Sequence, residues 1–212
     1  MNVINFKEYL LFILFILLVF TVLFIIYMSS DGNIMYYYIE NSDLDIEFKD
    51  ITSKILSNTK WKNIHSIKEV KNNIDADIII KLATDEELDK WHNDKLDDKL
   101  DDKYDDGTPI RFSITWQGSK SKPRVYINYK NWQGVPYSGL TVDNYRKYVI
   151  EHEFGHALGY NHLECNENTV VNGRCPVMYQ STRGCNNYKC GFIPSIKDFN
   201  APILPFAYRL NK

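Results

Sequence analysis

The segment at residues 152–162 constrains the fold of this chain more than any other feature. It reads H-E-F-G-H-A-L-G-Y-N-H, so it holds three histidines and one glutamate at fixed spacing. His152 and His156 lie one turn apart on the same face of an α-helix, and both imidazoles can therefore bind one ion at about 2 Å. Glu153 points to a neighbouring direction, close to the ion but outside its ligands. The spacing therefore requires a helix through this segment.

The third histidine can join the other two only if the helix ends before it. On a continuous helix, His162 would lie roughly 15 Å along the axis from His152. Gly159 accepts the left-handed backbone conformation that ends helices, so we expect the chain to turn there. Three imidazoles and one open position are typical of a catalytic zinc site. We therefore predict Zn²⁺ as the cofactor and Glu153 as the base that activates a zinc-bound water.

The residues around this motif predict a helix from Tyr145 to Tyr160. Either Thr141 or Asp143 can cap its start. An apolar stripe at helical spacing is expected to face the core, and it comprises Ile150, Phe154, Ala157 and Leu158. The alternatives for the motif are a chance cluster of helical histidines and a structural metal site. His65 and His92 have no such partners and are expected to be ordinary surface or half-buried residues.

The three-histidine motif resembles the signature of the metzincins, a clan of zinc endopeptidases in which a methionine turn follows the histidines. Met178 follows His162 in the sequence Cys-Pro-Val-Met-Tyr. The resemblance implies that Met178 forms an apolar floor under the zinc and that Pro176 and Tyr179 wall the substrate pocket. In several metzincins, a tyrosine two positions after the methionine helps to hold the transition state. Tyr179 follows Met178 directly, so this role is not carried over to it.

A closer resemblance covers most of the chain after its N-terminal segment. It is to a metzincin-like domain family known mainly as a domain of unknown function. The stretches that carry it are 128–132, 145–149, the zinc motif, 162–165 and 176–182. The resemblance implies an α+β fold with a twisted mixed sheet, a backing helix and an active-site helix.

Alternation and composition predict the elements that precede the active-site helix. The backing helix is expected over 44–56, with Ser42 or Asp43 as its cap. Four strands are predicted at 35–39, 76–82, 111–116 and 124–128. A short helix near 196–200 is the one further element expected after the zinc motif.

The segment 93–107 is an acidic, low-complexity insert with a period of four residues. A calcium site is one interpretation of its aspartates. However, lysines are interleaved and the D-x-D-x-D-G order of a calcium loop is absent. We therefore expect a solvated surface loop.

Residues 9–28 read YLLFILFILLVFTVLFIIYM and carry no charge. A helix of this length spans about 30 Å, which is the thickness of a bilayer core. A secretory signal peptide would have a shorter apolar region and a small-residue cleavage site. Ser29 and Ser30 leave cleavage open as an alternative, but the length favours an uncleaved transmembrane anchor that binds the lipid bilayer.

The flanking charges predict the orientation of this anchor. Lys7 precedes it and acidic residues follow it, so the short tail at 1–8 is expected to be cytoplasmic. A stalk at 29–34 would then lead to the peptidase domain at 35–212. The predicted protein is a single-pass, type II membrane protein with this domain extracellular, lumenal or on a virion or cell surface.

The four cysteines all follow the zinc helix. They are Cys165, Cys175, Cys185 and Cys190. An even number in so short a segment indicates two disulfides in an oxidising compartment, although the pairing has three possibilities. The alternative is a cytosolic domain with four reduced cysteines.

A net charge of −2 gives no reason to expect a nucleic-acid partner. The main functional hypothesis is a membrane-anchored zinc-dependent endopeptidase that acts on a peptide or protein substrate. The alternative is a catalytically silent, zinc-stabilised binding module of a surface or envelope. Hydrolysis of a non-peptide amide by the same zinc and water chemistry is a weaker third hypothesis.

Overall fold

The structure of this protein is a computed structural model that describes residues 12–21, 34–92, 112–116, 122–134, 139–185 and 187–203. The chain divides into two compact units, Met1–Ile34 and Met35–Lys212. The predicted tail at 1–8 and the acidic insert at 93–107 lie outside the described residues. Nearly all of the predicted stalk lies outside them as well.

In the first unit, the structure describes one helix over residues 12–21. Across the described ranges, no helix is both long enough and apolar enough to cross a membrane. The predicted transmembrane span over 9–28 is therefore not found, and the predicted single-pass, type II arrangement is contradicted.

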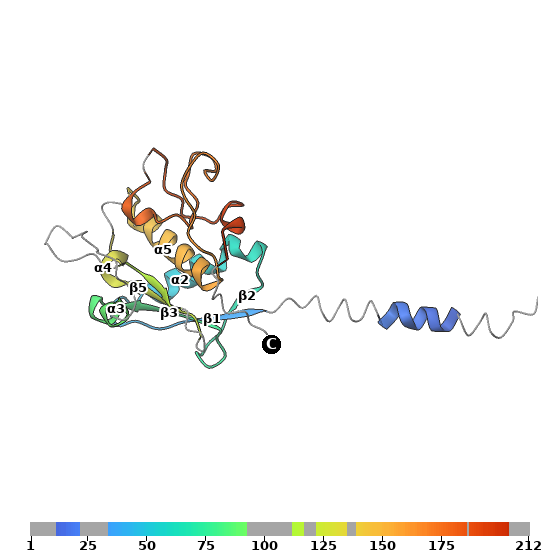
Figure 1. Ribbon diagram of the computed structural model, residues 1–212. Coiled ribbons are helices and arrows are strands. Elements are labelled where there is room, and N and C mark those ends of the chain that lie inside the picture. The colour runs from blue at the N-terminus through green and yellow to red at the C-terminus, as the bar shows by residue number, and fades with distance from the viewer. Residues whose placement is uncertain are drawn as a thin grey trace, which may run out of the picture. The chain divides into compact units, whose positions relative to one another are not determined.

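The second unit is built on a mixed sheet of five strands in the order β2-β1-β3-β5-β4 (Figure 1). The strands are β1 (Met35–Ile39), β2 (Ile67–Glu69), β3 (Ile78–Ala83), β4 (Ile114–Trp116) and β5 (Arg124–Asn128). The neighbours from β2 to β5 are parallel, whereas β4 pairs antiparallel with β5 at the edge. The predicted α+β class is confirmed.

The central position of β3 follows from its sequence. Ile78, Ile79 and Ile80 are all buried, because the sheet is covered on both faces where they lie. The four predicted strands are all present, two of them with the predicted bounds and two displaced or shortened by a few residues. Strand β2 was not predicted, since its three residues include a lysine and a glutamate and lack an apolar run.

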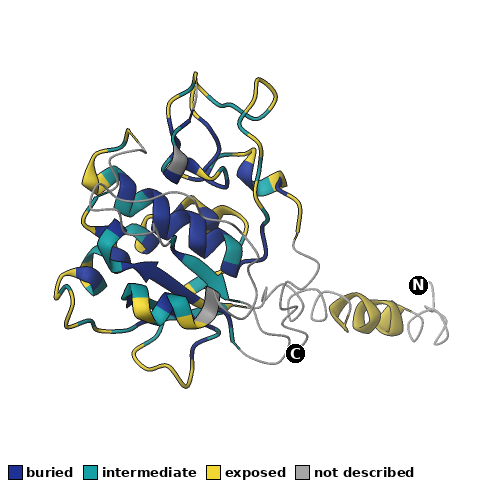
Figure 2. Ribbon diagram, turned by 60° about the vertical axis from the view of Figure 1, so that its left-hand side comes forward, coloured by how far each residue is buried: buried dark blue, intermediate teal, exposed yellow. Residues whose placement is uncertain are grey.

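Helices α2 (Phe48–Ser57) and α5 (Val142–Ala157) lie together on one face of the sheet (Figure 1). The remaining helices are α3 (Asp85–His92) and α4 (Tyr129–Trp132), with 3₁₀ turns η1 (Lys60–Asn63), η3 (Ser181–Arg183) and η4 (Asp198–Asn200). The largest core cluster fills the space between the sheet and α5, which is buried along most of its length (Figure 2). A smaller cluster on the other face joins Leu88 of α3 to Tyr126 of β5.

The backing helix α2 begins later than predicted. The sequence predicted a start near residue 44 with Ser42 or Asp43 as cap, but the first helical residue is Phe48. The Ser42 hydroxyl instead accepts a hydrogen bond from the Leu44 amide, and the Asp45 carboxylate accepts one from the Glu47 amide. These short-range bonds hold the backbone in turns, which is how such side chains compete with a helix.

Candidate metal centre

Helix α5 carries the centre, and both of its ends follow from local sequence. Thr141 is its N-cap, and the Thr141 hydroxyl accepts a hydrogen bond from the Asn144 amide at 3.4 Å. The last helical residue is Ala157, and Gly159 has a φ of 101°, in the region that favours glycine. The predicted cap and the predicted stop are both confirmed, although the helix begins three residues earlier than expected.

The turn at Gly159 brings the third histidine back to the first two. The Nε2 atom of His156 lies 3.1 Å from Nε2 of His152 and 3.1 Å from Nε2 of His162. Ligand atoms of the three residues all lie within 4.8 Å of one another. Two ligands at zinc distance around a tetrahedral ion lie roughly 3.3 Å apart. The geometry of this group therefore fits a single bound metal ion.

The hydrogen bonds of the Nδ1 atoms of His152 and His156 also fit a bound metal ion. Nδ1 of His152 lies 2.7 Å from the Val177 carbonyl, and Nδ1 of His156 lies 2.7 Å from the Tyr160 carbonyl. A carbonyl only accepts hydrogen bonds, so each Nδ1 donates a proton and each neutral ring presents its Nε2 lone pair to the centre. Burial lowers the pKa of His152 well below its usual value and that of His156 to about 4. Both rings are thus neutral near pH 7, as metal ligands must be.

The centre is open on one side. His152 is buried and His156 is partly buried, whereas His162 is exposed. Three nitrogen ligands with solvent on one side leave space for a further ligand, which is the arrangement of catalytic rather than structural sites.

Glu153 lies next to the first histidine and is only 5% exposed. Burial raises the pKa of its carboxyl to about 7, while a hydrogen bond from Thr115 opposes that rise. The Thr115 hydroxyl donates to Oε2 of Glu153 at 2.7 Å. Thr115 belongs to strand β4, and sequence reasoning did not find it. No sequence signal connects two residues so far apart in the chain.

Met178 lies directly beneath α5 and is fully buried. A Cβ atom at Gly155 would overlap the Met178 sulfur, so the two residues are in close contact. The Met178 amide donates to the Asp198 carboxylate at 2.8 Å, and its carbonyl accepts from the Leu163 amide at 3.1 Å. The second bond links the turn to the residue after His162. Asp198 is a second contributor that sequence reasoning missed.

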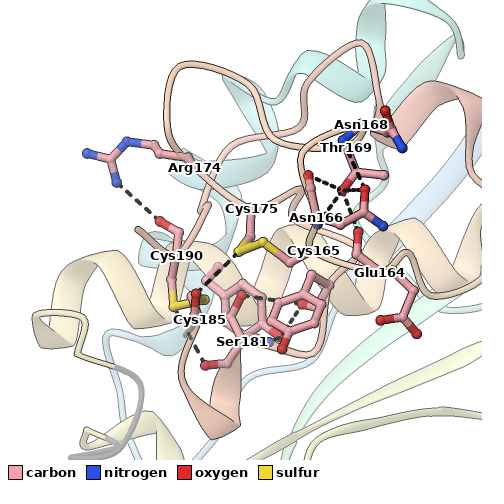
Figure 3. Close-up of a disulfide and its surroundings, with 12 residues drawn as sticks. Glu164, Cys165, Asn166, Asn168, Thr169, Arg174, Cys175, Ser181, Cys185 and Cys190 are labelled. Atoms are coloured by element: carbon pink, nitrogen blue, oxygen red, sulfur yellow. Dashed lines mark hydrogen bonds between the residues drawn. A yellow bond between two sulfur atoms is a disulfide. The ribbon is translucent and has the colours of Figure 1, made fainter. Parts of the chain in front are cut away.

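The four cysteines form two disulfides, as predicted. The pairs are Cys165–Cys175 and Cys185–Cys190, which resolves the three possibilities (Figure 3). Arg174 reaches across and donates to the Cys190 carbonyl at 3.1 Å (Figure 3). The structure thereby excludes the alternative of four reduced cysteines.

The two residues predicted to wall a substrate pocket lie beside these disulfides. Pro176 is buried, and its carbonyl accepts from the Tyr179 amide at 3.2 Å. Tyr179 is half-buried and packs against the cysteine cluster. Their contacts thus connect the turn at Met178 to the cross-linked segment.

Two further titratable residues, His65 and Glu151, are at least half-buried. His65 is half-buried, and its Nε2 lies 2.9 Å from the Tyr160 hydroxyl, away from the three-histidine group, as expected. Glu151 is buried on α5, where burial raises its pKa to about 8 and the Thr59 hydroxyl donates to it at 2.6 Å. The side chain of His92 lies outside the described part of the structure.

Comparison with known proteins places this centre within a family. No curated protein matches the chain. The family model described as "Protein of unknown function (DUF3152)" matches residues 41–198, a range that contains α5, all three histidines and Met178. This range is well over half of the chain, and the chain therefore belongs to the DUF3152 family.

Proposed function

We propose that this protein is a zinc-dependent endopeptidase of the metzincin type. The observation that carries the proposal is the convergence of His152, His156 and His162 beside the buried carboxylate of Glu153. A purely structural metal site has no need of such a carboxylate. When bound, zinc would supply a Lewis acid that polarises the scissile carbonyl and promotes ionisation of water.

The donor set favours zinc over other common ions. It consists of three neutral imidazoles, and the described residues bring no carboxylate into the ligand group. Calcium and magnesium prefer oxygen ligands, whereas imidazole suits zinc and other transition metals. Three histidines with a fourth position open to solvent are the ligands of catalytic zinc sites.

Glu153 is the proposed general base. One oxygen of its carboxylate accepts a hydrogen bond from Thr115, which leaves the other oxygen free to accept a proton from water. The same carboxyl can then pass that proton to the leaving amine, so one residue serves both halves of peptide hydrolysis. Water attack on the carbonyl carbon breaks the C–N bond and yields a carboxylate and an amine.

The arrangement of elements around the centre supports the metzincin type. A mixed sheet with one antiparallel edge strand lies under α2 and α5, and Met178 packs against Gly155, the residue before His156. The two disulfides are typical of proteins in oxidising compartments, so substrates there are the natural candidates.

The test compares the full chain, with disulfides formed and zinc loaded, against E153Q on a diverse peptide pool. Mass spectrometry of the products reads cleavage, and metal analysis reads zinc. We expect E153Q to retain zinc and lose cleavage, while E167Q, which changes an exposed glutamate, retains both. A folded wild type that binds one zinc and cleaves no peptide would refute the proposal and favour a zinc-stabilised binding module. Release of a small amine from amide compounds alone would favour the non-peptide amidase.

A further inference from the structure

We propose that Thr115 is a positioning residue for Glu153, and that its hydroxyl selects which carboxylate oxygen is available for proton transfer. The inference rests on the proposed function, because positioning matters only if Glu153 acts as a base. Thr115 would touch neither the metal nor the substrate in this role. It would act entirely through Glu153.

The contact between the two residues has two points. Oγ1 of Thr115 lies 2.7 Å from Oε2 of Glu153 and 2.8 Å from the Glu153 main-chain carbonyl. The single hydroxyl hydrogen of Thr115 is thus shared between the main-chain carbonyl and the carboxylate of the same residue. This contact restricts the side-chain torsions of Glu153 and holds Oε2 on the side of strand β4. Oε1 is left as the oxygen that can accept a proton.

The hydroxyl itself is held by the sheet. Thr115 pairs with Val125 in the antiparallel register of β4 and β5, and β4 contacts α5 directly. A group on a rigid strand positions its partner more accurately than one on a loop. The anchor therefore transfers the position of the sheet to a side chain on the helix.

Burial makes the anchor necessary. Glu153 is 5% exposed, and a buried carboxylate without a donor is costly. Among the residues that the structure describes, no other side chain donates to it. Without the hydroxyl, the carboxylate would turn toward water or toward the metal to regain a partner. Either movement would take it from the position that proton transfer requires.

The choice of threonine at position 115 also indicates that the hydroxyl has a role. Valine has the same shape as threonine and suits a strand equally well, so a strand position alone would not call for threonine. The substitution T115V is therefore nearly isosteric and removes only the hydrogen bond. T52V provides a matched control, since the buried hydroxyl of Thr52 has no hydrogen-bond partner in the described structure.

The experiment uses the full chain loaded with zinc and measures kcat, KM and zinc affinity for wild type, T115V, T115S and T52V. For T115V we expect kcat to fall by roughly 10- to 100-fold, as misplaced catalytic groups do, with KM and zinc affinity changed by less than about 3-fold. T115S restores the hydroxyl and should recover most of kcat. T52V should match wild type. If T115V folds poorly, T115A removes the same hydroxyl without a steric clash and takes its place.

A crystal structure of the zinc-loaded T115V protein provides a readout that does not depend on activity. We expect the Glu153 carboxylate to adopt a different orientation from that in wild type. An unchanged carboxylate, or a T115V kcat equal to that of wild type, overturns the positioning role. If the wild type cleaves nothing, the proposed function fails, and the crystal structures alone then decide whether Thr115 anchors Glu153.

Discussion

The sulfur of Met178 packs against Gly155 and occupies the space where any other amino acid at position 155 would place its Cβ atom. The indole of Trp61 closes the same space, with Cζ2 only 2.8 Å from that position. Gly155 precedes His156, so this contact sets how closely the part of α5 that carries the histidines approaches the turn at Met178. The absence of a side chain at residue 155 is thus a requirement of packing around the centre.

The substitution G155A tests this requirement. Alanine would favour the helix by about 1 kcal/mol over glycine, but overpacking a filled core costs about 1–3 kcal/mol. Because the Met178 sulfur and the Trp61 ring both stand in the way, we expect overpacking to win and the free energy of unfolding to fall. Urea denaturation measures it. The double variant G155A/M178A should show favourable coupling, and an undiminished stability of G155A would contradict the close contact.

Removal of the metal should destabilise the folded domain. A ligand that binds only the native state at 100 times its Kd contributes about 2.7 kcal/mol, so a chelator should lower the Tm of zinc-loaded protein. Replacement of His152, His156 or His162 by alanine should abolish tight zinc binding in calorimetry. His65→Gln is the control, since His65 contacts Tyr160 and does not belong to the three-histidine group. Wild-type affinity in all three variants would exclude this centre.

Removal of one disulfide should lower the affinity for zinc, whereas removal of the other should not. Cys165–Cys175 lies between His162 and Met178 in the chain, whereas Cys185–Cys190 closes a separate short loop. Chain entropy predicts a loss of about 2–3 kcal/mol for either bridge. Only the alanine pair at 165 and 175 should also weaken zinc binding, by roughly 10-fold or more, as loss of outer support does. Equal zinc affinity in the two paired variants would argue against this support.

Acid should destabilise the protein partly through His65. Burial lowers the pKa of His65, so its neutral form is favoured in the folded state beside the Tyr160 hydroxyl. The unfolded chain takes up the proton first as pH falls below about 6.5. Stability is therefore present above that pH and is lost as pH falls through the lower, folded-state pKa. Urea midpoints between pH 7.5 and 4.5 should decline less steeply for H65Q than for wild type, and parallel curves would disprove this contribution.

Local sequence rules predicted those parts of the fold that depend on neighbours in the chain. The i, i+4 spacing brings His152 and His156 to one face, and Gly159 ends the helix where the third histidine must turn back. The β-branched content of 76–82 and 124–128 predicted two strands, which the structure has at Ile78–Ala83 and Arg124–Asn128. These features follow from backbone geometry and side-chain shape within a few residues.

Apolar composition predicted the structure less well than these local rules did. The uncharged run at 9–28 predicted a membrane-spanning helix, yet no helix among the described residues is long enough and apolar enough to cross a membrane.

By itself, the sequence determined the three histidines of the candidate metal centre, the helix that presents two of them, and the number of disulfides. Only the tertiary structure decided which cysteines pair, that Thr115 holds Glu153, and that Met178 fills the space at Gly155. Thr59 and Glu151, which are 92 residues apart, meet for the same reason. Strand register and helix packing bring such partners together, and these depend on the burial of the whole core rather than on spacing along the chain.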